Sequence, residues 1–326
     1  MTTHDGATGD DRPVVTIVMP FLNTDLRFFE EAVKSVLSQT YEEWELLLVD
    51  DGSETEISQY ARARSMADPG RIRYLEHPGH RNLGASAARR LGMEHARGSL
   101  LSFLDSDDIW LAGMLEERVR VLQTRSNIGM TYGNTRYWYG WTGMADDARR
   151  DFIPDLGVSS NEVIPAPGFL EHLVVGAIAI PCTCSVMVRM EVARLAGGFD
   201  DGDTLYEDQR FYARVALIAD VLPTSECLNW YRQHPNSFCA VSGRSGRQAE
   251  FHAAHLNWLE ELFETCGIEE GHIWRALRRQ QWLYGARAKR PLEHGSSAFG
   301  RRLRKRILKI ENALLPEAVS RRIWSR

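Results

Sequence analysis

The sequence predicts an α/β fold built on a mostly parallel sheet that helices flank. Short β-branched or leucine-rich runs have the character of buried strands, and segments with helical spacing of apolar residues alternate with them. This alternation is typical of βαβ units. From about residue 248 the pattern is helical throughout, which predicts a helical C-terminal extension.

The first strand–helix–strand unit is the clearest. Val14–Met19 is a β-branched run closed by Pro20, which predicts a buried strand. Apolar residues then recur at helical spacing over Phe29–Leu37, with Asp25 as the expected N-cap. Leu46–Val49 is the second predicted strand.

The remaining elements follow the same alternation more loosely. Residues 132–168 mix aromatics, Gly, Pro and charges, and predict long loops with short strands. The other predicted strands cover residues 72–75, 100–104, 185–188 and 228–231. The other predicted helices cover residues 57–66, 83–96 and 209–218.

Length, composition and charge are those of a globular protein with an unusual C-terminal segment. The chain has 326 residues, of which 44% are hydrophobic and 25% charged. We expect a disordered tail over 1–12, a main domain over 13–240 and a helical extension over 241–326. From Arg287 onward there are 12 Lys/Arg and 3 Asp/Glu, a charge of +9, against 27 and 41 before it, a charge of -14. The acidic body argues against nucleic acid as a partner, and the basic segment predicts a partner of its own.

Cysteine usage and hydropathy predict a cytoplasmic protein. The five cysteines are odd in number and lack C-x-x-C spacing, so we expect buried free thiols in a reducing compartment. Residues Met1–Arg12 are polar and lack the apolar core of a secretory signal. The longest apolar run, Leu173–Ile180, is too short to span a bilayer.

Two acidic clusters stand at predicted strand ends. Asp50 and Asp51 precede a Gly-Ser turn, and a turn or a helix cap would explain them. Asp105, Asp107 and Asp108 are three carboxylates within four residues, which repel one another unless a cation lies among them. Ligands of α/β sheets bind beyond the carboxyl ends of strands, and Mg²⁺ or Mn²⁺ bridges carboxylates to phosphates there. The clusters therefore predict a nucleotide diphosphate with its divalent metal.

Eight short segments occur in a characteristic order along roughly residues 13–240. They are VTIVMPFLN (15–23), SVLSQTY (35–41), LVDDGS (48–53), NLGASAAR (82–89), FLDSDD (103–108), GGFD (197–200), ED (207–208) and YRQHPNS (231–237). In this order they resemble family 2 glycosyltransferases, which have the GT-A fold. The resemblance implies transfer of a sugar, with inversion, from a UDP- or dTDP-sugar to a hydroxyl of a saccharide or lipid-linked acceptor. It also implies dependence on Mn²⁺ or Mg²⁺ and a place in surface polysaccharide or glycoconjugate synthesis.

The resemblance implies a set of substrate-binding residues at the strand ends. Asp51 would accept a hydrogen bond from the donor base, Asp50 would support that loop, and Asp105 would lie near the ribose. Arg90 departs from the family pattern, which has an asparagine there. The implied substrate-binding residues are Pro20, Asn23, Asp50, Asp51, Asn82, Arg89, Asp105 and Glu207.

The resemblance also implies a general base and metal ligands. Asp208 would accept the proton of the acceptor hydroxyl, although two adjacent acids are also common in the first turn of a helix. Asp107 would bind the metal. Asp108 is either a second ligand or the cap of a helix beginning near Trp110. His234 is either a further metal ligand near the diphosphate or a loop histidine.

Other classes of protein lack their signatures here. No Gly-x-Gly-x-x-Gly follows the first strand, as a dinucleotide-binding oxidoreductase requires, and no Gly-Lys-Ser/Thr of a P-loop is present. The serious alternative is a catalytically silent module that binds sugar nucleotides, against which the intact Glu207–Asp208 pair argues.

The basic C-terminal segment has the pattern of an amphipathic helix closed by Pro316 and followed by Trp324. One interpretation is a helix docked on the body by its apolar stripe. The other is reversible attachment to an anionic membrane surface, which would make the protein peripheral at the inner face of the membrane. The stripe is Phe299, Leu303, Ile307, Ile310 and Leu314, and the surrounding cations are Arg301, Arg302, Arg304, Lys305, Arg306 and Lys309.

Overall fold

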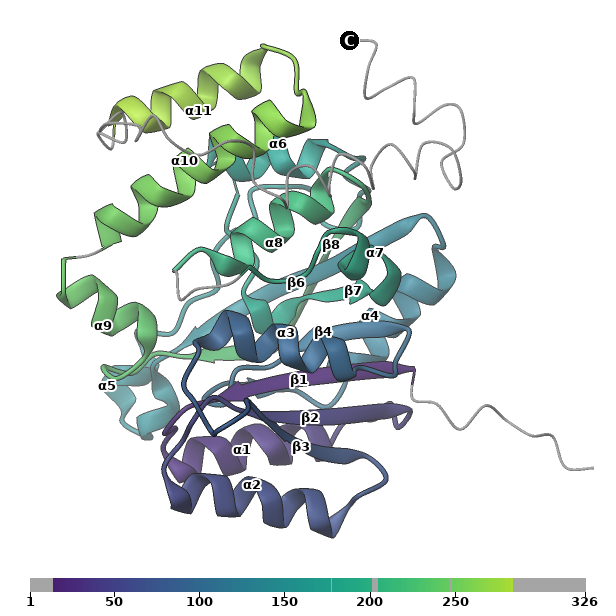
Figure 1. The fold of residues 1–326 in the computed structure, drawn as a ribbon, viewed down its shortest axis with the longest axis vertical. Helices are drawn as coiled ribbons and strands as arrows, with labels where there is room; N and C mark the ends of the chain where they lie inside the picture. Colours follow the sequence, from purple (N-terminus) through teal and green to yellow (C-terminus); the bar gives the residue numbers. More distant parts are fainter. Residues whose placement is uncertain (1–13, 177, 201–204, 247, 284–326) are drawn as a thin grey trace, which may run out of the picture.

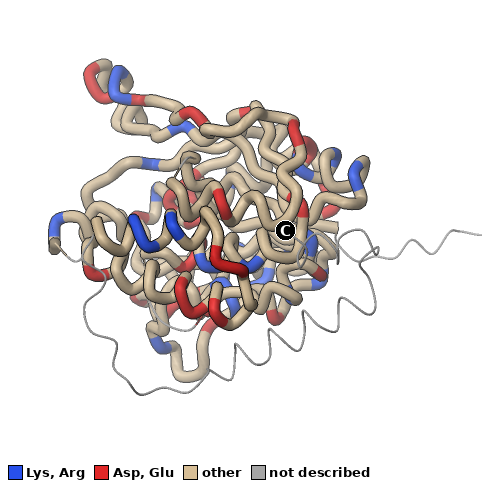
Figure 2. Tube along the Cα trace, turned by 90° about the horizontal axis from the view of Figure 1, so that it is seen from above, with Lys and Arg blue, Asp and Glu red and all other residues tan. Residues whose placement is uncertain are grey.

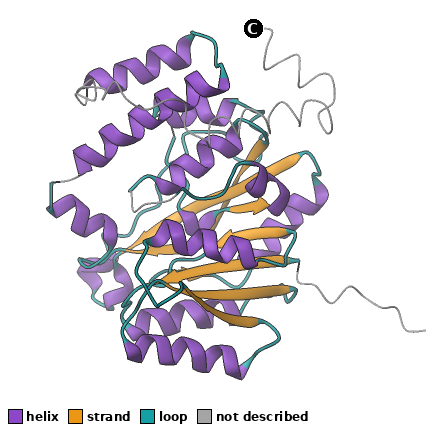
Figure 3. Cartoon of the chain, viewed as in Figure 1, coloured by secondary structure: helices purple, strands orange, loops and turns teal. Residues whose placement is uncertain are grey.

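The computed structural model describes residues 14–176, 178–200, 205–246 and 248–283, and the strands found there form one sheet (Figures 1 and 3). Its strand order is β3-β2-β1-β4-β7-β6-β8-β5. The strands are β1 (Val15–Phe21), β2 (Trp44–Asp50), β3 (Ile72–Glu76), β4 (Leu100–Phe103), β5 (Ile109–Trp110), β6 (Ile128–Trp138), β7 (Met187–Arg189) and β8 (Asp220–Arg232).

The sheet is mixed, with a parallel N-terminal half. β1 pairs in parallel with β2 and β4, and β2 with β3. β7 runs antiparallel between β4 and β6, whereas β6 and β8 are again parallel and β5 is antiparallel to β8. The direction of winding reverses between β1 and β4, and α/β sheets bind ligands beyond the carboxyl ends of strands at such a point. The predicted α/β fold with flanking helices is confirmed.

Helices cover both faces of this sheet (Figure 3). Two short 3₁₀ turns, η1 (Gly140–Thr142) and η2 (Thr183–Ser185), complete the described elements. The α-helices are α1 (Leu26–Leu37), α2 (Thr55–Ala67), α3 (Ala85–His95), α4 (Met114–Thr124), α5 (Ala145–Ala148), α6 (Gly168–Val175), α7 (Met190–Leu195), α8 (Glu207–Ala216), α9 (Phe238–Arg244), α10 (Gln248–Cys266) and α11 (His272–Leu283).

The alternation of side chains along the strands builds a core on each face. In β1, Val15, Ile17 and Met19 join the core that α1, α2 and α4 cover. Val18 faces the opposite core, which α3, α6, α7 and α8 cover. Because both faces are buried, β1 and β2 are apolar almost throughout, as the sequence indicates.

The helices that follow residue 240 pack on the same body. Leu256 and Phe263 of α10, with Trp274 and Leu277 of α11, belong to the core on the α8 face, and α11 contacts α6 (Figure 1). The division into domains at residue 240 stays a prediction. The expected tail over 1–12 and the basic amphipathic segment lie outside the described residues.

The charge distribution and the apolar character of the helices bear on which partners the protein binds. Figure 2 shows acidic and basic positions interspersed over the described body. Among the described helices, none combines the length and the apolar character that crossing a bilayer requires.

Several sequence predictions are wrong in detail. Residues 128–138 form the long strand β6, although 132–138 were expected to be mostly loop. Pairing with β8 along its length stabilises this strand, and that partner is distant in sequence. Pro20 lies inside β1 instead of closing it. Among the free cysteines, Cys239 is exposed, so not every thiol is buried.

Candidate active site

The loop after β2 is organised around Asp50. One carboxylate oxygen accepts the backbone N–H groups of Gly52 (3.1 Å) and Ser53 (2.7 Å). The other accepts the hydroxyls of Ser58 and Tyr74, the latter at 2.8 Å. Asp50 is fully buried. These bonds occupy both oxygens, so Asp50 supports the loop, as its expected role requires.

Asp51 ties this loop to the N-terminus of α3. Its two carboxylate oxygens accept the backbone N–H groups of Leu83 (2.8 Å) and Gly84 (2.9 Å). The Asn82 side chain also accepts the Gly84 N–H, at 3.1 Å. Gly52 has φ +87°, and a Cβ there would lie 2.8 Å from the Asn82 nitrogen. The structure thus brings Asp51 and Asn82 together, and contact of Asp51 with a donor base stays a prediction.

The end of β1 lies against the same loop. Pro20 is buried opposite Val49 of β2. Asn23 has a positive φ of 47°, its side chain accepts the Glu54 N–H at 2.6 Å, and its own N–H donates to Ser53 Oγ at 3.2 Å. Asparagine tolerates this left-handed conformation better than most residues. The ends of β1 and β2 therefore form one hydrogen-bonded rim.

Arg89 joins the β4 loop to the start of α8. Its guanidinium donates to Asp105 at 2.5 Å and to Glu207 at 2.9 Å, and its side chain is only 5% exposed. Burial alone would lower the pKa of Arg89, but the two carboxylates raise it. One buried cation therefore places Asp105 and the Glu207–Asp208 pair at the same edge of the sheet.

Asp208 lies in the first turn of α8. It accepts the Gln209 N–H at 2.7 Å. Burial, with the neighbouring Glu207 carboxylate, raises the pKa of Asp208 to about 7. Burial also raises the pKa of Glu207, against the opposing effect of Arg89. A carboxylate whose pKa lies near neutral pH is suited to accept a proton.

Asp107 and His234 lie side by side although they come from different loops. Asp107 Oδ2 and His234 Nε2 are 2.9 Å apart. Arg232, at the end of β8, donates from Nε to the Asp107 carbonyl at 2.7 Å and from its backbone N–H to Asp108 Oδ1 at 2.9 Å. The side chains of Asp107 and His234 are partly exposed. They form a carboxylate–imidazole pair at the edge where Asp105 lies.

One of the two alternatives predicted for Asp108, the cap of a helix near Trp110, is wrong. Strand β5 follows this residue, and α4 begins only at Met114 with Gly113 as its N-cap, so Asp108 caps no helix near Trp110. Burial, with the nearby Asp107, holds the pKa of Asp108 well above its usual range. Its role as a ligand beside Asp107 stays a prediction.

Potential metal-ligand atoms gather in threes at two places within the described ranges. One place is Asp108 with Cys182 and Cys184, and the other is Asp50 with Glu76 and His80. The predicted set of Asp107, Asp108 and His234 is not among them. Within this set, Asp107 Oδ2 and His234 Nε2 lie 2.9 Å apart.

Sequence reasoning missed Arg232. Its guanidinium carbon lies 4.2 Å from the Phe28 ring centroid and 4.5 Å from that of Trp138. A guanidinium N–H of Arg232 donates to Glu31 Oε2 at 2.5 Å. Such stacking on aromatic faces favours a guanidinium. The available signal was its position two residues before His234 in the segment 231–237, from which only His234 was predicted as a site residue.

Comparisons with known proteins bear on the family and the fold. Residues 16–155 match the family described as "Glycosyl transferase family 2". A UDP-Glc:alpha-D-GlcNAc-diphosphoundecaprenol beta-1,3-glucosyltransferase, WfgD of Escherichia coli, is 37% identical over 38% of this chain and 46% of its own length. The putative teichuronic acid biosynthesis glycosyltransferase TuaG of Bacillus subtilis is 34% identical over 35% and 44%. The matched regions thus span about half or less of these curated relatives.

Solved structures share the fold. S. aureus TarS in complex with UDP-GlcNAc superposes with a TM-score of 0.62 at 14% identity, covering 94% of this chain and 82% of that one. The Pyrobaculum calidifontis mannosyltransferase PcManGT, in complex with GDP-Man and Mn²⁺, gives 0.57 at 15% identity, covering 95% and 78%. Residues 16–155 therefore match glycosyl transferase family 2, and the chain has the GT-A fold.

Proposed function

We propose that this protein transfers a sugar from a nucleotide diphosphate sugar, UDP- or dTDP-linked, to an acceptor hydroxyl with inversion of the anomeric configuration. The observation that carries the proposal is that the Arg89 guanidinium donates hydrogen bonds to both Asp105 and Glu207. Through it, the candidate base at α8 lies beside the acidic loop expected to bind the donor. The activities for which WfgD and TuaG are named support a role in polysaccharide or glycoconjugate synthesis, with a saccharide or lipid-linked acceptor.

Asp208 performs the proton transfer in this proposal. With a pKa raised to about 7, it takes the proton of the acceptor hydroxyl as that oxygen attacks the anomeric carbon. The bond to the diphosphate breaks on the opposite face, which inverts the configuration. Arg89 holds Glu207 and Asp105 in place during this step, because its guanidinium is already committed to both carboxylates.

Asp107 and His234 fit a divalent cation. Their facing oxygen and nitrogen atoms are partly exposed, and carboxylate with imidazole is a donor set that Mn²⁺ accepts, whereas Mg²⁺ favours oxygen ligands. A bound cation would offset the negative charge that develops on the departing diphosphate. Arg232 fixes the Asp107 backbone, and with it the direction from which the carboxylate approaches.

The test combines donor screening with a metal-ligand variant. Thermal stabilisation by UDP-, dTDP- and GDP-sugars is measured with Mn²⁺ and with a chelator. We expect a UDP- or dTDP-sugar to stabilise the wild type only when metal is present, and Asp107→Ala to lose this dependence together with transfer. Equal stabilisation with Mn²⁺ and with chelator would contradict the metal assignment. Donor binding without release or transfer of sugar would indicate the catalytically silent module.

A further inference from the structure

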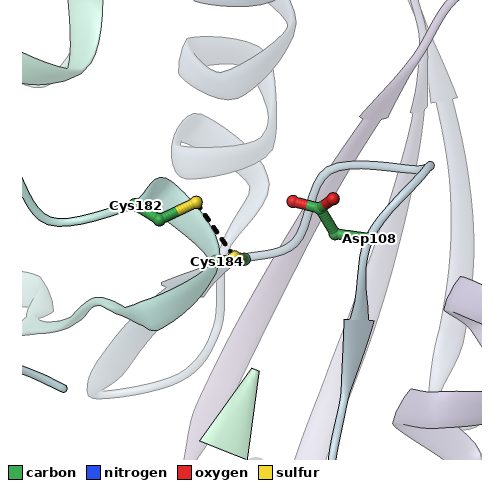
Figure 4. Close-up of side chains that lie close together, drawn as sticks. All are labelled: Asp108, Cys182 and Cys184. Atoms are coloured by element: carbon green, nitrogen blue, oxygen red, sulfur yellow. Dashed lines mark hydrogen bonds between the residues drawn. The ribbon is translucent and has the colours of Figure 1, made fainter. Parts of the chain in front are cut away.

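Two thiols and a carboxylate meet behind the 105–108 loop (Figure 4). Cys182 Sγ and Cys184 Sγ are 3.1 Å apart, and the potential ligand atoms of both thiols and Asp108 lie within 4.8 Å of one another. Asp108 follows β4, whereas Cys184 lies in the η2 turn that precedes β7 and Cys182 is the N-cap of that turn. The pairing of β4 with β7 brings these two segments together.

The Asp108 carboxylate has one oxygen without a partner. Oδ1 accepts the Arg232 N–H at 2.9 Å, but Oδ2 is buried and has no hydrogen-bond donor in the described structure. Asp108 is 0% exposed. A buried carboxylate oxygen without a donor is costly, and a proton or a cation has to compensate it. In this structure it is the two thiols that complete a group of potential ligands with it.

The backbone that carries the thiols is held in place. The Trp110 indole N–H donates to the Cys184 carbonyl at 2.6 Å, and the Ser185 hydroxyl donates to the Cys182 carbonyl at 2.8 Å. Cys184 is buried and directs its thiol toward Asn229 Oδ1 at 3.6 Å, whereas Cys182 is partly exposed. The site is therefore preorganised, with Cys182 as its accessible side.

The donor set determines which cations suit this site. Thiolate and carboxylate are both ligands that zinc-class ions accept, and such ions can bind three protein ligands and leave a fourth position open. Mg²⁺ and Mn²⁺ favour oxygen and would not select thiolates. We infer that Asp108, Cys182 and Cys184 form a binding site for a thiophilic divalent cation, distinct from the donor-metal position at Asp107 and His234.

Binding has a defined stoichiometry and a structural effect. Each thiol becomes a thiolate ligand and releases one proton to solvent. The Asp108 carboxylate, after releasing any proton that it holds in the absence of the cation, takes the remaining protein position. The cation would cross-link the loop after β4 to the η2 turn. Because it binds only the folded chain at this geometry, it would raise the thermal midpoint in proportion to the logarithm of its concentration.

The experiment uses the full chain, reduced with a phosphine and stripped of metal. Co²⁺ is titrated in, and the thiolate-to-cobalt charge-transfer absorption is followed, with Zn²⁺ as competitor. We expect one Co²⁺ per chain, displaced by Zn²⁺ but not by excess Mn²⁺. Cys182→Ser and Cys184→Ser should each lower the absorption to about half and weaken binding by ~10-fold or more. Cys227→Ser and Cys239→Ser, which alter thiols outside the cluster, should change neither.

Two further variants separate the possible explanations. Asp108→Asn should keep the two-thiolate absorption but bind Co²⁺ more weakly, whereas Asp107→Ala should keep both absorption and affinity, whatever becomes of sugar transfer. Cys182→Ala changes only the partly exposed position, and circular dichroism checks that this variant is folded. The test therefore still holds if the variant at the buried Cys184 misfolds. Undiminished absorption after the loss of Cys182 or of Cys184 would overturn the inference. So would finding these two thiols joined as a disulfide in the freshly purified chain.

Discussion

Folding and catalysis place opposite requirements on the protonation state of Asp208. Asp208 sits where burial and the adjacent Glu207 both disfavour its charge, and its pKa is raised to about 7 from a usual 3.8. A group whose pKa is raised on folding binds its proton more tightly in the folded state. Its contribution favours folding at low pH and is lost as the pH rises through 7. Catalysis needs the opposite, ionised form.

Asp208→Asn separates these two requirements. The amide cannot take a proton, so we expect kcat to fall by ~10²–10⁴-fold while donor affinity stays nearly unchanged. The variant should also unfold at higher denaturant at about pH 8 than the wild type, with a smaller difference at about pH 4.5, since its amide carries no charge to desolvate on folding. Wild-type kcat should rise with pH through about 7. Near-wild-type turnover in the variant would assign the base elsewhere.

Arg89 compensates two carboxylates at once. Arg89→Ala would leave Asp105 and Glu207 without their shared cation, and we expect the free energy of unfolding to fall by ~3–5 kcal/mol and transfer to be lost. Arg90→Ala is the matched control on the same helix, because Arg90 is half-exposed and lies 3.9 Å from the exposed Glu94. It should change stability by less than about 1 kcal/mol. If urea denaturation showed the same loss of unfolding free energy for Arg89→Ala and Arg90→Ala, the bridging role of Arg89 would be contradicted.

Among the elements, the loop after β2 and the start of α3 depend on each other. Asp51 binds the backbone of Leu83 and Gly84, and the close approach leaves no room for a side chain at Gly52. The proposed donor site therefore depends on two segments that are separated by β3. Local sequence alone identifies the Gly-Ser turn but not its partner.

Gly52→Ala tests this dependence. The positive φ alone costs about 1–2 kcal/mol for a residue with a Cβ, and the contact with the Asn82 backbone adds to it. We expect lower stability and weaker nucleotide-sugar binding by calorimetry. Gly113→Ala is the control, since a Cβ there meets nothing within 4 Å and φ is -88°. Unchanged donor affinity in Gly52→Ala would mean that the 82–84 segment does not shape the pocket.

Local signals predicted the N-terminal half of the fold well. The strands at 46–49 and 72–75 and the helix capped by Asp25 are present because their patterns arise from neighbours in sequence and from burial on both faces. The strand character of residues 132–138 was missed because pairing with β8 determines it. Trp110 was expected near a helix start, but it pairs with Asn229 in a short antiparallel strand.

Across the whole molecule, the candidate site also contains residues that could be predicted from the sequence and residues that could not. Residues at the ends of β1, β2 and β4 could be predicted because parallel strands bring their carboxyl ends to one edge. The orientation of Asp108 toward Cys182 and Cys184, and the stacking of Arg232, could not, since both depend on contacts between segments far apart in sequence. The C-x-C spacing of the cysteines carried no signal until β4 and β7 were placed side by side.

The basic C-terminal segment, which lies outside the described residues, bears on where the whole protein works. From Arg287 onward it carries +9 against the -14 of the rest of the chain. We propose that it attaches the protein to the anionic inner face of the membrane, where lipid-linked acceptors are found. Each Lys or Arg near such a surface contributes ~1 kcal/mol, so the six cations over 301–309 suffice for reversible attachment. Docking on the acidic body is the competing outcome.

Co-sedimentation with liposomes distinguishes these outcomes. The full chain and a chain ending at Ser297 are compared on anionic and neutral vesicles, at low and high salt. We expect only the full chain to sediment, only with anionic vesicles, and less so at high salt, because screening shortens the range of the attraction. Both proteins should show the same thermal midpoint if the segment contributes nothing to packing. Retention of neither protein, or of both equally, would contradict membrane attachment, and a lower midpoint of the truncated chain would instead assign the segment to the body.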